Sequence, residues 1–95
     1  PYAFPNSADL LANLRKAAEL VDAVTLGNHG VLACGDDVEQ AFLRAELVEH
    51  LASIQLRALP VGKPRLVPDA DVARLLEART KAGLGPAARK LKPRA

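Results

Sequence analysis

Few side chains in this sequence could carry out chemistry, because the chain has two histidines, one cysteine, one tyrosine and no tryptophan. His29 follows Asn28 and lies between Gly27 and Gly30. Glycine permits sharp turns and close approach of the backbone to a ligand, and imidazole is the commonest metal ligand in proteins. From spacing alone, however, a lone histidine in a turn is more often structural, and a catalytic zinc ion usually has three protein ligands.

The other candidates do not complete such a site. Cys34 lies on a predicted strand, where we expect it to be buried as a small hydrophobic residue. His50 follows Glu46 by four residues on a predicted helix, a spacing typical of an exposed or interfacial side-chain pair. The glycines at 27 and 30 lack the spacing of dinucleotide and phosphate-binding loops, so the sequence predicts no nucleotide site.

Two short apolar segments and a preceding helix are predicted to position His29. Residues 23–27 and 30–35 are short, partly β-branched and flanked by glycines, which indicates two strands joined by a tight turn. Upstream, apolar residues recur at helical spacing from residue 8 to about residue 18, with Asn6 or Ser7 placed to cap the helix.

A longer helix is predicted after the second strand. Asp36 or Asp37 can cap it, and Gln40 lies in capping-box register with Asp37. Two adjoining apolar stripes run along this helix, more than one sheet face usually covers. We therefore expect burial against the sheet on one side and against a neighbouring helix or subunit on the other. This is preferred to a membrane-surface helix because Glu46 and Glu49 interrupt the polar face. The stripes comprise Val38, Ala41, Phe42, Ala45, Val48, Ala52 and Leu56, and Leu43, Leu47, Leu51 and Ile54.

The C-terminal third begins with a linker. Three prolines in residues 60–68 favour an extended segment, and a short helix is predicted from Asp69 to a stop at Gly83. The chain is acidic up to residue 78, with seven basic and eleven acidic side chains, whereas residues 79–95 hold six basic and no acidic ones. Residues 86–95 are predicted to be a basic, flexible tail. Nucleic-acid binding by this tail is disfavoured, because residues 79–95 include no aromatic side chain.

Length and composition bound the remaining possibilities. The 95 residues, 49% of them hydrophobic, suit one small, mainly helical globular domain. A chain of this length buries a small hydrophobic core unless another domain or subunit packs against it. The single cysteine excludes an internal disulfide and favours the reducing cytoplasm. No apolar run reaches the roughly 20 residues of a membrane span, so we expect a soluble protein that does not bind membranes. The absence of methionine suggests that the chain is part of something longer.

The segment from Val24 to Gly35, followed by the acidic opening and Ala-rich face of the long helix, resembles the second half of the class II aldolase/adducin family. That family's pattern is an apolar strand, Asn-His-Gly, a second apolar strand ending in Gly, and a long helix. The resemblance extends back to Tyr2 and forward to residues 68–77, covering roughly residues 2–85. It identifies residues 1–85 as the C-terminal part of such a domain, ahead of the tail at 86–95.

The resemblance implies a fold, a cofactor and an activity. The fold is α/β, a three-layer α/β/α sandwich around a mostly antiparallel sheet, of which this chain would supply two strands and three helices. Family members assemble as homo-oligomers, commonly tetramers, with active sites where subunits meet. Their zinc is held by a His-x-His pair from the first half and by the histidine of the Asn-His-Gly turn, which falls on His29. Zinc acts as a Lewis acid, a first-half glutamate moves the proton, and a sugar phosphate such as L-fuculose 1-phosphate is cleaved reversibly to dihydroxyacetone phosphate and an aldehyde.

The sequence also departs from the family's pattern. It has no His-x-His pair, no glutamate ahead of one and none of the first-half loops that hold phosphate, so the chain alone is expected to be inactive, with no catalytic residue of its own assigned. Ala82 stands where the aldolases have a tyrosine that aids proton transfer, and the only tyrosine here is Tyr2. Alternatives within the family are a pentose-phosphate 4-epimerase, a dehydratase or a decarboxylase. An adducin-like interaction domain without metal is a further alternative, and a nucleic-acid binder is a weaker one.

Overall fold

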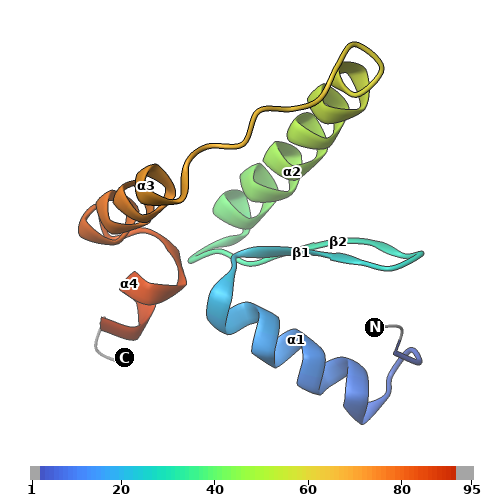
Figure 1. The fold of residues 1–95 in the computed structure, drawn as a ribbon. Coiled ribbons are helices and arrows are strands. Elements are labelled where there is room, and N and C mark those ends of the chain that lie inside the picture. The colour runs from blue at the N-terminus through green and yellow to red at the C-terminus, as the bar shows by residue number, and fades with distance from the viewer. Residues whose placement is uncertain (1–2, 92–95) are drawn as a thin grey trace. The chain divides into compact units, whose positions relative to one another are not determined.

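The computed structural model describes residues 3–91, in which four helices and a two-stranded antiparallel sheet follow one another along the chain (Figure 1). The chain divides into two units, Pro1–Val48 and Glu49–Ala95. The first contains helix α1 (Ala8–Leu20), strands β1 (Ala23–Leu26) and β2 (Gly30–Ala33), and the start of helix α2 (Val38–Ala58). The second contains the rest of α2, helix α3 (Asp69–Lys81) and helix α4 (Gly85–Leu91).

Helix α1 begins at the predicted cap. The Ser7 hydroxyl accepts a hydrogen bond from the Leu10 backbone N–H at 3.1 Å, which satisfies one of the donors that a first helical turn leaves without a partner. The helix ends at Leu20, where Val21 is already extended and donates its N–H to Ala17 C=O at 2.9 Å. The expectation of a capped helix is confirmed, and the helix extends two residues beyond the predicted end near residue 18.

The predicted hairpin is also confirmed. Strands β1 and β2 pair from Ala23 opposite Ala33 to Leu26 opposite Gly30, so residues 27–29 form the connection. The end of the hairpin away from the turn, called the open end here, carries one further backbone bond. Just beyond the Ala23–Ala33 pair, the Cys34 N–H donates to Asp22 C=O at 2.8 Å.

The start of α2 is fixed by reciprocal side-chain bonds. The Asp37 carboxylate accepts from the Gln40 N–H at 2.7 Å, while the Gln40 side-chain oxygen accepts from the Asp36 N–H at 2.8 Å. The pattern is that of a capping box in which the return bond reaches one residue further upstream than usual. In addition, the Arg44 guanidinium donates to Cys34 C=O at 2.6 Å and lies 3.7 Å from the Asp22 carboxylate. These contacts attach the first turns of α2 to the open end of the hairpin.

The predicted burial of α2 is not observed. The helix has no buried residue, and the side chains of Leu43, Leu47, Leu51 and Ile54 are between 51% and 55% exposed. The reason is that a sheet of two short strands offers too little surface to cover two apolar stripes. Among residues 3–91 the only buried hydrophobic residue is Ala88, so the expectation of a thin core is confirmed. The described residues include no helix long and apolar enough to cross a membrane.

The second unit follows the predicted linker and short helix. Residues 62–68 have no regular structure, and α3 starts at Asp69. Gly83 stops the helix with a positive φ of 75°, and two backbone bonds, Gly83 N–H to Thr80 C=O and Leu84 N–H to Arg79 C=O, both 3.0 Å, complete a Schellman motif.

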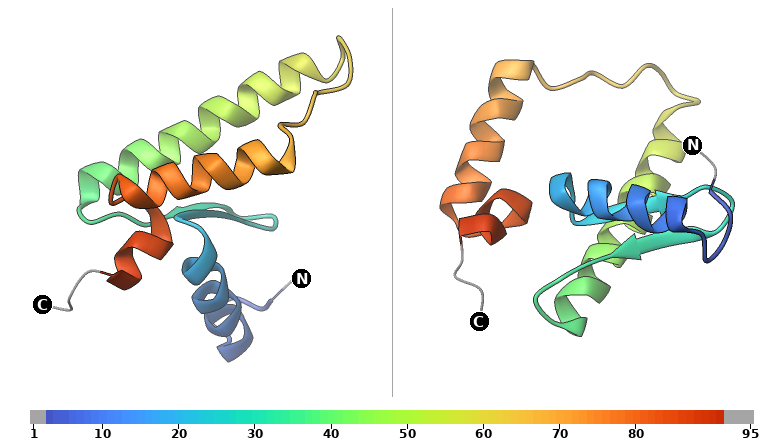
Figure 2. Two further views of the ribbon diagram at one scale, coloured as in Figure 1. Left: turned by 60° about the vertical axis from the view of Figure 1, so that its left-hand side comes forward. Right: turned by 90° about the horizontal axis from the view of Figure 1, so that it is seen from below.

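Four helices are present where three were predicted, because Gly85–Leu91 forms α4 rather than the start of an irregular tail. Pro86 suits the first turn of a helix, where its missing N–H has no partner to lose, and basic residues in the last turn suit the helix dipole. Helix α4 contacts α3, and Figure 2 shows it beside the C-terminal end of that helix. The rest of the predicted tail, residues 92–95, lies outside the described residues.

Candidate functional site

His29 lies in the connection of the β1–β2 hairpin. The His29 N–H donates to Leu26 C=O at 3.0 Å, which closes a four-residue turn. Asn28, the third residue of this turn, has a φ of 64°, and Gly30 directly after His29 has a φ of 151°. Both Asn28 and His29 are exposed, so the imidazole is accessible rather than held in a core.

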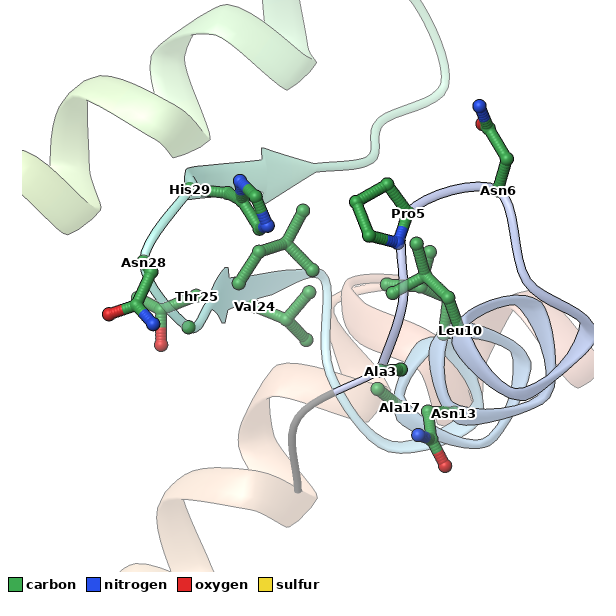
Figure 3. Close-up of a pocket in the computed structure, with 13 residues that line it drawn as sticks. Ala3, Pro5, Asn6, Leu10, Asn13, Ala17, Val24, Thr25, Asn28 and His29 are labelled. Atoms are coloured by element: carbon green, nitrogen blue, oxygen red, sulfur yellow. The ribbon is translucent and has the colours of Figure 1, made fainter.

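An open pocket of about 650 Å³ lies beside this turn, within the first unit. Three segments line it: the chain before α1, one side of α1, and the β1 strand with its turn. Figure 3 shows His29 and Asn28 at the hairpin end of the pocket, with Pro5 and Leu10 on the segments opposite. Its polar groups come from Asn6, Asn13, Thr25, Asn28 and His29, and the rest of the lining is Ala3, Pro5, Leu10, Leu14, Ala17, Val24, Leu26 and Gly27.

The polar groups at this pocket suit one metal ligand and several neutral hydrogen bonds. His29 offers an imidazole nitrogen, a usual zinc ligand, and amide and hydroxyl groups can donate and accept hydrogen bonds, although Figure 3 shows the Asn6 and Asn13 amides directed away from His29. Within residues 3–91, no three His, Cys, Asp or Glu side chains are grouped so that they could hold a metal ion. His29 can therefore supply one ligand to a zinc ion, and a complete zinc site requires further ligands from elsewhere.

The other sequence candidates do not join His29. Cys34 is exposed at the end of β2, so the prediction that it is buried was wrong: the described residues place too little over that end of the strand to cover it. His50 and Glu46 are exposed one turn apart on α2, and neither is among the residues that line the pocket. Ala82 is the C-cap of α3, and Tyr2 lies outside the described residues.

Three polar residues of the pocket were not identified from the sequence. Asn13 could have been found, because it shares a side of α1 with Leu10, Leu14 and Ala17 at helical spacing. Asn6 lies in the loop before α1 with a φ of 60°, and no periodicity marks such a position. Thr25 lies in β1 between the partly buried Val24 and Leu26, and alternation along a strand places it on the opposite face from them, so no pattern in the sequence marked it as a pocket residue.

Comparison with known proteins points to one family. The profile described as "Class II Aldolase and Adducin N-terminal domain" matches residues 1–56, which include the α1 helix, the hairpin and most of α2. No solved structure gives a significant match to the chain.

Three relatives illustrate the range of the similarity. A 5-deoxy-D-ribulose 1-phosphate aldolase of Bacillus thuringiensis is 36% identical over 53 residues, which are 56% of this chain and 25% of the relative. Protein hu-li tai shao of Drosophila melanogaster is 43% identical over 44 residues, 46% of this chain and 4% of the relative. An L-fuculose phosphate aldolase of Haemophilus influenzae is 34% identical over 62 residues, 65% of this chain and 29% of the relative. The matched part of the chain thus spans less than a third of each of these proteins.

Proposed function

Since the chain belongs to the class II aldolase and adducin family, we propose that it is the C-terminal part of a zinc-dependent aldolase and that His29 is one of three histidine ligands to the metal. The parent protein cleaves a sugar phosphate reversibly to dihydroxyacetone phosphate and an aldehyde. The observation that carries the proposal is the position of His29, accessible in a tight hairpin turn at the end of a pocket, in a segment covered by the family profile.

The residues of this chain would prepare the site in two ways. The hairpin presents His29 in a turn closed by its own backbone N–H, so little backbone freedom is lost when the imidazole binds a metal. The mainly apolar lining of this open pocket would exclude water once another part of the protein covers it, and electrostatic interactions at the site would then be stronger. Zinc held there supplies a Lewis acid that polarises the carbonyl group of the substrate.

The remaining parts of the site come from outside this chain in our proposal. A His-x-His pair and a glutamate from a preceding half supply the other ligands and the general base, within a three-layer sandwich assembled as a cytoplasmic homo-oligomer. Two features support this. Among the described residues, β1 pairs only with β2, which leaves a hydrogen-bonding edge on each side of the hairpin. The α2 stripe formed by Leu43, Leu47, Leu51 and Ile54 is exposed, which leaves an apolar surface for another part of the protein to cover.

The test replaces His29 in the intact parent protein. His29→Ala should reduce zinc from near one equivalent per chain to background, and should lower aldol cleavage by more than the roughly 10- to 100-fold cost of losing an outer-shell partner of a metal. His50→Ala is the matched control, because it removes an exposed imidazole that lies on α2. If His29→Ala retains both zinc and activity, the ligand assignment is wrong.

A second candidate is a non-catalytic interaction domain. It is favoured by the similarity to Protein hu-li tai shao, whose name denotes no enzyme and of which the match covers 4%. Zinc analysis of the parent protein separates the two: a zinc-free parent without lyase activity supports the interaction domain. The names of the aldolase relatives do not decide the aldehyde half of the substrate, since they specify different sugar phosphates.

A further inference from the structure

The turn that presents His29 depends on a backbone conformation that most residues avoid. Asn28 has a φ of 64° and is the third residue of the turn closed by the His29 N–H and Leu26 C=O. A positive φ at this place is typical of type II turns, in which glycine or asparagine is usual. Asparagine tolerates it better than other residues with a Cβ, because its short polar side chain can hydrogen-bond locally.

This conformation determines where His29 can lie. With Gly27 unchanged, a negative φ at Asn28 would carry the chain away from Leu26 and break the 3.0 Å bond made by the His29 N–H; keeping the bond would require Gly27 to change as well, as in a type I turn. On the other side, Gly30 has a φ of 151° and pairs with Leu26, so the chain returns into β2 at once. His29 is therefore held between two residues of unusual φ, and a change at either one would redirect its side chain.

We propose that Asn28 is a positioning residue for His29: its left-handed backbone, and not its amide group, holds the imidazole at the end of the pocket. The zinc aspect of this inference rests on the proposed function of His29. The rival explanation is that the Asn28 amide acts on the ligand directly, since Asn28 also lines the pocket. The two explanations predict different results when glycine replaces Asn28. Glycine adopts a positive φ freely but has no amide side chain, so it preserves the backbone of the turn and removes the amide.

The experiment compares Asn28→Gly with Asn28→Ala using two measurements. The first is hydrogen exchange of the His29 amide in the metal-free 95-residue chain, which reports the turn alone. The second is zinc affinity of the parent protein, determined by competition with a chelator, together with the visible spectrum of the cobalt-substituted protein. Asn28→Gly should remain near wild type in both. Asn28→Ala should show roughly 5- to 30-fold faster exchange and a similar loss of zinc affinity, from the usual cost of a left-handed alanine.

Gly83 provides a matched control. It also has a positive φ, at 75°, but it ends α3 and is not among the residues that line the pocket. Gly83→Ala places an alanine in the same left-handed region and should lower thermal stability without changing the His29 exchange rate, the zinc affinity or the cobalt spectrum.

Each contrary result has a distinct meaning. If Asn28→Gly loses zinc affinity as severely as Asn28→Ala while its His29 exchange is unchanged, the amide acts directly and the positioning role is wrong. If Asn28→Ala leaves the His29 exchange rate unchanged, or Gly83→Ala alters zinc binding equally, the role is also wrong. If exchange behaves as expected but His29→Ala still binds zinc fully, the positioning of His29 stands and the proposed function fails.

Discussion

Arg44 gives the sharpest prediction, because a single side chain fastens the open end of the hairpin. Its guanidinium donates to Cys34 C=O at 2.6 Å and lies 3.7 Å from the Asp22 carboxylate, and these two residues are themselves joined by the 2.8 Å bond from Cys34 N–H to Asp22 C=O. The side chains of Arg44 and Asp22 are only 21% and 13% exposed, so solvent screens the contact less than it would a surface pair.

The substitution Arg44→Met keeps most of the aliphatic length and removes the donors. A hydrogen bond to a charged group contributes about 1.5 to 3 kcal/mol, and the longer ion pair to Asp22 adds under about 1 kcal/mol. From the hydrogen bond alone, the population of molecules in which the open end of the hairpin has come apart should rise about 10- to 150-fold, because about 1.36 kcal/mol corresponds to a tenfold change in an equilibrium constant. A two-stranded hairpin has little other support, so the effect should be local and easily seen.

Amide hydrogen exchange measured by NMR tests this prediction at the Cys34 N–H, which lies inside the affected contact. Arg57→Met is the matched control, since Arg57 is exposed in the last turn of the same helix and should leave this amide unchanged. If the Cys34 exchange rate in Arg44→Met stays within about twofold of wild type, the reasoning is refuted. The guanidinium would then add no stability to the open end of the hairpin beyond that of the backbone bond from Cys34 to Asp22.

Three further predictions concern the helices and the thiol. Ser7→Ala should destabilise α1 by about 1 kcal/mol and lower its helix content by circular dichroism, whereas Ser7→Asp should retain both; equal losses in the two variants would contradict the cap. Gly83→Ala, at a φ of 75°, should cost about 1 kcal/mol in the thermal stability of the second unit, and Gly62→Ala, with open space and no such φ, should be neutral. Cys34 should react with a disulfide reagent in the native chain nearly as fast as in urea, and strong native protection would show that the thiol is covered.

The local elements could be predicted from the sequence because local signals determine them. The Ser7 cap, the glycines around His29 and the Asp37–Gln40 pair are all encoded within a few residues, and each forms the expected contact or turn. Helix α4 was missed because residues 86–95 were predicted to be a flexible tail, although proline is common in the first turn of a helix and Pro86 occupies such a position.

The parts that could not be predicted depend on contacts between elements. Period-two alternation places Cys34 on the same side as Leu32, yet nothing in the sequence states whether another element covers that side. The stripes of α2 indicate what must be buried but not by what. His29 was assigned from family resemblance, while Asn6 and Asn13 line the same pocket only because the loop before α1 and one side of α1 lie beside the hairpin.

The hairpin has a consequence for the order in which the protein folds. Its ladder joins residues no more than ten positions apart, from Ala23 opposite Ala33 to Leu26 opposite Gly30. Such short loops close quickly, and hairpins form in about 1 to 10 μs, far ahead of sheets that need distant strands. The turn around His29 can therefore form before contacts between distant parts of the polypeptide are made. If His29 is the metal ligand proposed above, its backbone geometry would be set before the distant parts of the site come together.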